Sequence, residues 1–188
     1  MGGSFDPIHV GHLVAANEVA QKLELDTVVF VPAGLPWQKG EITGREHRFQ
    51  MVKLATAGNQ KFAVSRCDLD REGPSYTVDT LASLGSEYAG ADLFFIGGAD
   101  AISGMDSWHE AGRIWELATV VAVTRPGHKL KLAEGFGSVL SVEIPLIEVS
   151  STEIRHRVEA GEPIRYLVPD SVADYIFRNR LYLGGSVE

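Results

Sequence analysis

The sequence predicts an α/β fold, a Rossmann-like parallel sheet with helices on both faces and a small helical C-terminal extension. Short apolar runs of the strand type alternate with segments in which apolar residues recur at helical spacing. This alternation is typical of parallel strands joined by helices that cover both faces of the sheet. The last third departs from it and ends in two helical segments, between which Gly161 and Pro163 indicate a break.

The predicted strands are short and rich in β-branched or aromatic residues, and Gly or Pro closes them. They cover residues 27–31, 62–66, 92–96 and 119–124, with 138–144 and 146–149 in the last third. Helices are expected over 13–24, 45–57 and 77–88, and the two C-terminal helices over 151–160 and 170–180. Because ligands of such sheets bind beyond the carboxyl ends of the strands, we expect the site in the loops after strands.

Length and composition favour one globular domain. A chain of 188 residues suits a single domain over 1–188, with a helical part over about 151–183 and a frayed tail over 184–188. No apolar run approaches the roughly 20 residues that cross a bilayer. The single Cys67 cannot form an internal disulfide, which fits a reducing cytoplasm. We therefore expect a cytoplasmic protein that does not interact with membranes.

The charge balance restricts the partners. Seventeen basic and twenty-five acidic residues give a net charge of −8. Sequence-independent nucleic-acid binding needs a basic surface, so this class of function is disfavoured. A pocket for a small anion depends on a few local charges, so the net charge does not exclude one. The sequence also leaves a homo-oligomer open.

The first residues predict an anion site. Gly2 and Gly3 allow a tight turn and close backbone approach, and Gly11 opens the helical pattern that follows. A glycine-rich turn that enters a helix presents free N–H groups and the positive end of the helix dipole. His9 and His12 lie three residues apart at this entry, so both can point toward one phosphate. An imidazolium in this position would stabilise charge that develops on the phosphate.

Two other interpretations of this segment remain. Two histidines at this spacing can bind zinc, but further ligands at suitable spacing are missing, and two isolated histidines are often surface residues. The chain also opens on the glycines without the apolar strand that normally precedes such a turn. Either a native strand lies upstream of Met1, or a tag or an altered sheet edge takes its place.

The residues from Gly2 to His12, GGSFDPIHVGH, resemble the signature of the nucleotidyltransferase superfamily that shares H-x-G-H with class I aminoacyl-tRNA synthetases. Further segments resemble bacterial nicotinate mononucleotide adenylyltransferase in order along nearly the whole chain, which makes 1–188 one nucleotidyltransferase domain. They are 31–39 (VPAGLPWQK), 71–81 (REGPSYTVDTL), 95–100 (FIGGAD), 108–109 (WH), 125–127 (RPG) and 149–155 (VSSTEIR). The resemblance implies that ATP and nicotinate mononucleotide give deamido-NAD and pyrophosphate, with Mg²⁺.

The resemblance implies an ATP side of the site. His12 and His9 would stabilise the transition state at the α-phosphate, and Arg155 adds a planar donor fork suited to phosphate oxygens. Asp100 either faces the ribose or stabilises a turn. Ser150 and Glu153 have the spacing of a capping box, which does not forbid phosphate binding beside it. The residues expected to bind ATP are Gly2, Gly3, Ser4, Phe5, His9, His12, Gly97, Asp100, Ser151, Thr152 and Arg155.

The resemblance also implies an acceptor side. Trp108 would stack on the nicotinate ring, although an isolated tryptophan is often a core residue. Thr77 and nearby backbone N–H groups would bind the nicotinate carboxylate and so discriminate against the amide. His109 departs from the tyrosine that is frequent in the family, and Trp37-Gln38 from its Pro-His. The residues expected to bind nicotinate mononucleotide are Ser4, Lys39, Arg48, Ser75, Tyr76, Thr77, Trp108 and His109.

Two cations are weaker candidates. Lys39, at the end of the 31–39 segment, would act on the phosphates as a catalytic residue, and Arg48 would bind the acceptor. Both side chains can equally be solvated surface. No carboxylate cluster predicts a metal cage, so Mg²⁺ would be held mainly by ATP phosphates and water. Another acceptor, such as nicotinamide mononucleotide or phosphopantetheine, and a non-catalytic nucleotide sensor are the alternatives.

Overall fold

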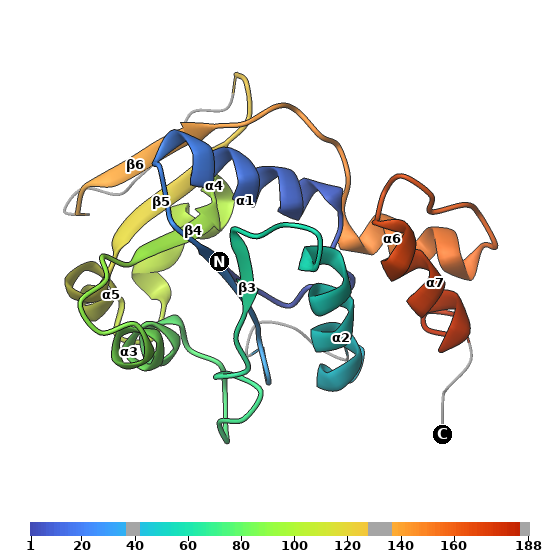
Figure 1. The fold of residues 1–188 in the computed structure, drawn as a ribbon, viewed down its shortest axis with the longest axis horizontal. Helices are drawn as coiled ribbons and strands as arrows, with labels where there is room; N and C mark the ends of the chain where they lie inside the picture. Colours follow the sequence, from blue (N-terminus) through green and yellow to red (C-terminus); the bar gives the residue numbers. More distant parts are fainter. Residues whose placement is uncertain (37–41, 128–136, 185–188) are drawn as a thin grey trace.

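The computed structural model describes residues 1–36, 42–127 and 137–184, and it has the predicted α/β architecture (Figure 1). Every strand pair in the described part of the chain is parallel. The strands are β1 (Gly2–Gly3), β2 (Val28–Pro32), β3 (Phe62–Val64), β4 (Phe94–Gly98), β5 (Thr119–Thr124) and β6 (Val139–Glu143). The α-helices are α1 (Val10–Lys22), α2 (Arg45–Thr56), α3 (Thr77–Glu87), α4 (Ala99–Ser103), α5 (Ala111–Leu117), α6 (Ser151–Glu159) and α7 (Asp170–Arg178), with a 3₁₀ turn, η1 (Met105–Ser107).

The strands form two three-stranded sheets, with the orders β1-β2-β3 and β4-β5-β6. β1 lies beside β4 without a ladder between them in the described residues. The carboxyl ends of β1 and β4 therefore lie close together, and the loops that follow both strands meet there. Open α/β sheets bind their ligands at such a place.

Helices cover both faces of the second sheet, as its side chains show. Phe95 and Val120 pack into one apolar cluster with residues of α3 and α5, whereas Ile96 and Val121 pack into another with residues of α1. Successive residues of a strand point to opposite faces, so this alternation places the two helix layers on opposite sides of the sheet. It also explains why β5, with the sequence TVVAVT, has successive apolar residues instead of an alternation of apolar and polar ones.

The C-terminal extension packs onto the same core as α1. Ile154 and Val158 of α6 and Val172 and Ile176 of α7 are buried in the cluster that contains β2. Figure 1 shows α6 and α7 on the side of α2, away from α3 and α5. The extension therefore lies against the half of the molecule that carries the first strand and the first helix.

Two sequence predictions about the fold are wrong, and three short elements were not predicted. Residues 146–149 form no strand, and the last backbone bond from this segment to β5 is donated by Ile144 to the carbonyl of Thr124. α4, η1 and α5 were not predicted, since elements of three to seven residues are too short for a clear apolar period. Gly2 and Gly3 form strand β1 instead of a turn, pairing with Val31 and Pro32.

Candidate active site

The loop between β1 and α1 carries the glycine-rich signature. Phe5 has a φ of 48°, a left-handed conformation that is uncommon for a residue other than glycine. Its ring is 2% exposed and meets the ring of His12 edge-on at a centroid distance of 5.1 Å. The same ring lies where a Cβ on Gly3 would be, at 3.1 Å, so a side chain at that position would displace it. Phe5 therefore fixes the end of β1 against the first turn of α1.

His9 and His12 lie together at the start of α1. His9 is the N-cap residue, and its backbone N–H donates to Nδ1 of His12 at 3.2 Å. The two rings stack with centroids 3.7 Å apart. Because Nδ1 of His12 accepts this hydrogen bond, the proton of the neutral ring is on Nε2. His12 lines the main cavity, so this tautomer makes it a donor there.

Burial of the His9 ring favours its neutral form in this structure, whereas an imidazolium was expected at this position. Burial, and then the charge of Arg125, lower its pKa to about 4. Its side chain is 8% exposed, and a Cβ on Gly11 would approach its Nδ1 to 3.1 Å. Gly11 thus lets the ring pack directly on the helix. We infer that His9 supports His12 more than it carries charge.

The lowered pKa of His9 predicts a pH dependence of stability. Between about pH 4 and 6.5 the unfolded chain binds a proton at His9 that the folded chain does not, so stability falls as the pH falls through this window. Thermal unfolding at pH 5 and pH 7.5 measures the effect. We expect His9→Gln to lose less stability on acidification than the unaltered chain. His156→Gln, which changes an exposed ring on α6, serves as the control, and equal losses in both variants would contradict the assignment.

The C-terminal extension holds the signature loop by its polar groups. The carboxylate of Asp6, 3% exposed, accepts from the backbone N–H of Thr43 at 3.1 Å and from the hydroxyl of Tyr182 at 2.7 Å. Burial first, and then Asp6, raise the pKa of Tyr182, so its hydroxyl stays a donor. Arg155 donates from Nη1 to the carbonyl of Asp6 at 2.8 Å, and Ser151 Oγ donates to the carbonyl of Pro7 at 2.9 Å.

Sequence reasoning did not identify Tyr182 or the role of Asp6. Asp6 lies within the signature, so its presence there was a signal, but its partners lie 37 and 176 residues away. Nothing in the local pattern around Tyr182 distinguishes it from a core aromatic. The cap of α6 was identified correctly, since Ser150 Oγ accepts from the Glu153 N–H at 3.1 Å.

Arg48 is a buried residue, which excludes the alternative that its side chain is solvated surface. Its side chain is 1% exposed. Nη1 donates to the carbonyl of Ser4 at 2.8 Å, Nη2 to that of Gly34 at 3.1 Å and Nε to that of Thr43 at 2.8 Å. The guanidinium thus joins the signature loop to two positions of the connection between β2 and α2. A contact with the acceptor stays a prediction.

The acceptor candidates on α3 lie opposite the signature. Ser75 Oγ accepts from the backbone N–H groups of Gly34 and Leu35, at 2.9 and 3.3 Å, and so fixes the loop after β2. Thr77 is the first residue of α3. Tyr76, its N-cap residue, makes no side-chain cap, and its ring stacks on His109 with centroids 4.3 Å apart. The first N–H groups of α3 are therefore oriented to receive an anion.

Trp108 follows η1 and is half-buried. Its ring meets Phe95 edge-on at 5.8 Å, and it packs against the apolar cluster beneath α3. It also lines the main cavity. Trp108 therefore packs against the core and also lines the cavity, and its stacking on the nicotinate ring stays a prediction.

One cavity of about 860 Å³ brings many of the predicted residues together. From the ATP side it is lined by Gly2, Gly3, Ser4, Phe5, His12 and Ser151, and from the acceptor side by Ser4, Ser75, Thr77 and Trp108. Lys39 lies outside the described residues, as do Trp37 and Gln38. The remaining described candidates are not among the residues that line this cavity: His9, Arg48, Tyr76, Gly97, Asp100, His109, Thr152 and Arg155.

The candidates at the end of β4 and on α6 have clear positions. Gly97 belongs to the strand and not to a turn, and a Cβ there would meet Ile102 at 2.9 Å. Asp100 is exposed in the first turn of α4. Thr152 Oγ1 accepts from Nη2 of Arg155 at 3.2 Å.

Within the described residues, no three His, Cys, Asp or Glu side chains could together hold a metal ion. Among the described helices, none has the length and apolarity to span a membrane.

Known proteins resemble the chain throughout. Residues 1–157 match the family model described as cytidylyltransferase-like. A protein of Leifsonia xyli subsp. xyli named "Probable nicotinate-nucleotide adenylyltransferase" is 55% identical over 184 residues, 97% of this chain and 92% of the relative. A protein of the same name from Arthrobacter sp. is 54% identical over 188 residues, 98% of this chain and 90% of the relative.

The chain belongs to the nicotinate-nucleotide adenylyltransferase family. Its fold is also that of a solved structure, a Plasmodium falciparum nicotinic acid mononucleotide adenylyltransferase complexed with NaAD. That structure superposes with a TM-score of 0.78 over 96% of this chain and 94% of the other, at 22% sequence identity. The family thus agrees with the resemblance of the signature segment and of the segments after it.

Proposed function

We propose that this member of the nicotinate-nucleotide adenylyltransferase family transfers the adenylyl group of ATP to nicotinate mononucleotide in NAD biosynthesis. The products are deamido-NAD (nicotinate adenine dinucleotide) and pyrophosphate. The observation that carries the proposal is the cavity that His12 and the signature loop line together with Thr77 and Trp108. This shared lining supports a role for His12 as a donor to the phosphates and for Trp108 as a platform for the pyridine ring.

The transfer needs no covalent enzyme intermediate. A phosphate oxygen of the acceptor attacks the α-phosphorus of ATP, the bond from that phosphorus to the bridging oxygen breaks, and pyrophosphate leaves with the electron pair. The protein contributes position and electrostatic stabilisation. Nε2–H of His12 donates to the phosphate oxygen on which charge develops, and neutral His9 stacks on His12 and holds its tautomer.

The remaining ATP contacts come from α6 and from the loop after β4. Ser151 and Arg155 already bind carbonyls of the signature loop, so they bring α6 next to the triphosphate. Further donors of Arg155, with Thr152 beside it, bind phosphate oxygens. Gly97 allows close approach of the nucleotide, and Asp100 lies at the ribose. These roles and that of Lys39 at the phosphates are part of the proposal.

Mg²⁺ fits this site as a companion of ATP. Because no three His, Cys, Asp or Glu side chains of the described residues could hold a metal together, the ion would be held mainly by phosphate oxygens and water. When bound, it neutralises charge on the phosphates. We place the whole activity in one domain over 1–188 and in the cytoplasm.

The nicotinate carboxylate decides the choice of acceptor. Thr77 and the N–H groups at the start of α3 would all donate to a carboxylate. An amide in the same place would leave some of these donors without an acceptor. Pyrophosphate release with ATP and each of nicotinate mononucleotide, nicotinamide mononucleotide and phosphopantetheine tests this. We expect kcat/KM for the nicotinate to exceed that for the amide by at least about 100-fold. Thr77→Val should reduce this ratio.

Other outcomes of the same assay would overturn the proposal. Equal rates with nicotinamide mononucleotide would contradict the site assigned to the nicotinate carboxylate. Pyrophosphate release with phosphopantetheine alone would show that the acceptor is a different one. Nucleotide binding in calorimetry without any product would favour a sensor.

A further inference from the structure

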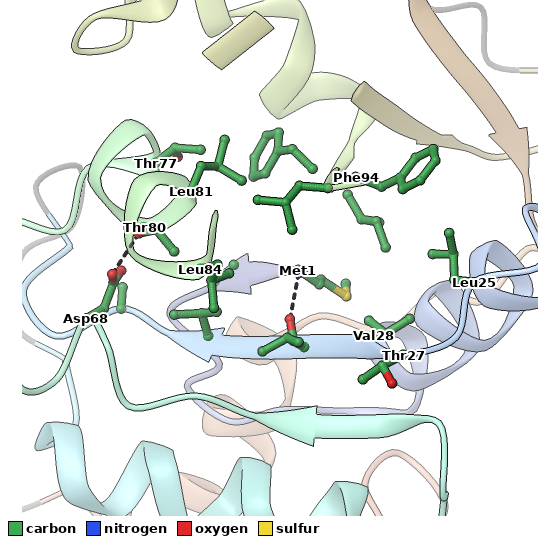
Figure 2. A pocket seen from close by; sticks show the side chains of 18 of the residues that line it. Met1, Leu25, Thr27, Val28, Asp68, Thr77, Thr80, Leu81, Leu84 and Phe94 are labelled. Carbon is green, nitrogen blue, oxygen red and sulfur yellow. Dashed lines mark hydrogen bonds between the residues drawn. The ribbon is translucent and has the colours of Figure 1, made fainter. Parts of the chain in front are cut away.

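Two buried carboxylates accept from hydroxyl groups near the cavity, one beside α3 and one in the signature loop. Thr80 Oγ1 of α3 donates to the carboxylate of Asp68 at 2.7 Å, as Figure 2 shows. Arg71 Nη2 also donates to Asp68 at 2.7 Å, so this charge has a cationic partner. In the signature loop, Oδ1 of Asp6 accepts from the neutral hydroxyl of Tyr182. The signature loop therefore depends on a donor that lies 176 residues away along the chain.

The chain after α7 turns back, which brings Tyr182 to this carboxylate. Arg180 and Tyr182 have φ values of 52° and 63°, in the left-handed region that is uncommon for residues other than glycine. The Leu181 N–H donates to the carbonyl of Ile176 at 3.0 Å and ties the turn to α7. Backbone strain of this kind persists only where surrounding contacts maintain it, and it is frequent at functional sites. The fold thus maintains a strained turn that ends in the contact of Tyr182 with Asp6.

The other partners of Asp6 connect the signature loop to the chain before α2. Oδ2 of Asp6 accepts from the Thr43 N–H at 3.1 Å, and the Thr43 carbonyl accepts from Arg48 Nε at 2.8 Å. Arg48 Nη1 donates to the carbonyl of Ser4 at 2.8 Å, which closes a ring of hydrogen bonds at the start of the loop. Tyr182 joins the C-terminal extension to this ring. It therefore connects the extension to the loop that carries the two histidines.

Without the hydroxyl of Tyr182, the buried carboxylate of Asp6 would lose its donor at Oδ1. An unpaired polar group in such a place is unfavourable, so the side chain would turn or admit water. Only Pro7 and Ile8 separate Asp6 from the N-cap residue of α1, so a shift at Asp6 would reach the histidine rings. A displacement of about 1 Å can lower a rate by about 100-fold. The transition state is affected most, because the charge that His12 meets develops only there.

We propose that Tyr182 is a positioning residue for the adenylyl transfer, which acts through Asp6 to hold the signature loop so that His12 meets the α-phosphate. This inference rests on the proposed function and adds to it a residue of the C-terminal extension. Tyr182 is not among the described residues that line the cavity, so it acts without contact to the substrates.

Tyr182→Phe tests the proposal, because it removes the hydroxyl and keeps the ring. Tyr175→Phe is the matched control, since the Tyr175 hydroxyl binds His47 Nδ1 at 3.0 Å and both rings pack against the same apolar cluster. We expect Tyr182→Phe to lower kcat for pyrophosphate release by about 10- to 100-fold, with KM for ATP changed by less than about 3-fold. Tyr175→Phe should keep kcat within about 2-fold, although each variant loses one hydrogen bond and should lower Tm by about 2–4 °C.

A double-mutant cycle shows whether Tyr182 acts through Asp6. In the Tyr182→Phe/Asp6→Ala variant, the loss of kcat should be smaller than the product of the two single losses by at least about 5-fold. In the Tyr175→Phe/Asp6→Ala variant, the two losses should multiply, because these side chains share no partner.

A measurement without substrates separates this inference from the proposed function. The Hε1 resonance of His12, identified by its absence in His12→Gln, reports the position of the signature loop. Tyr182→Phe should shift this resonance, whereas Tyr175→Phe should shift that of its own partner, His47. If the unaltered chain transferred no adenylyl group, the proposed function would fail, and these resonances would still decide whether Tyr182 positions the loop.

Three results would overturn the role of Tyr182. One is a kcat of Tyr182→Phe within about 2-fold of the unaltered chain, or the same loss of kcat in Tyr175→Phe. Another is a His12 resonance that Tyr182→Phe leaves unchanged. The third is a raised KM for ATP at unchanged kcat, because it would assign the hydroxyl to substrate binding instead of the chemical step.

Discussion

His12→Ala is expected to lower kcat by about 10²–10³ while the chain remains folded. Its Nε2–H is the donor that the signature loop directs into the cavity, and loss of one preorganised donor of this kind costs about 2.7–4 kcal/mol of transition-state stabilisation. The fold should lose the hydrogen bond from the His9 N–H, about 0.5–1.5 kcal/mol, together with the ring contacts to Phe5 and His9. Steady-state pyrophosphate release, with thermal unfolding of the same preparation, measures both quantities.

A conservative variant separates donation from packing. The amide nitrogen of His12→Gln can reach the Nε2 position, so this variant should retain more turnover than His12→Ala. His156→Ala changes an exposed histidine of α6 and is the control for the loss of an imidazole. Near-normal kcat in His12→Ala would remove His12 from the mechanism. Equal loss in the Gln and Ala variants would argue against donation from this position.

Arg48→Met should lower the free energy of unfolding by about 3–5 kcal/mol. Methionine keeps much of the apolar stem but leaves the carbonyls of Ser4, Gly34 and Thr43 without their charged donors. For a chain of this size, Tm should fall by roughly 6–20 °C. Urea unfolding monitored by circular dichroism gives the free energy directly.

The control for this change lies on the same helix. Lys53→Met exchanges an exposed cation of α2 and should alter stability by less than about 0.5 kcal/mol. Arg48→Lys is a milder test, since one ammonium cannot span three carbonyls, and most of the loss should remain. If Arg48→Met were as stable as Lys53→Met, the joining role of the guanidinium would be refuted.

The sequence predicted features whose cause is local. The stripe of Val78, Leu81 and Leu84 identified α3, and all three side chains are buried as expected. The proximity of His9 and His12 followed from their spacing at a helix start. The carboxyl-end rule predicted that the site lies in the loops that follow strands.

The features that could not be predicted depend on distant partners. The burial of Arg48 requires three carbonyls from two separate loops, and the spacing of apolar residues does not indicate such a site. The neutrality of His9 is a consequence of packing, because burial of the ring opposes its charge. The bond from Tyr182 to Asp6 joins residues 176 positions apart. Long-range polar contacts of this kind produce no periodic pattern in the sequence.

The contacts between the two ends of the chain have a consequence for its synthesis. Ribosomes add residues from the N-terminus, and segments fold as they emerge. The signature loop around residue 6 is complete within the first turn of α1, yet Ser151, Arg155 and Tyr182 are made last. A nascent chain therefore carries its histidines long before their loop has its full set of partners. Competence to react with ATP should appear late, when α6 and the residues after α7 have left the ribosome.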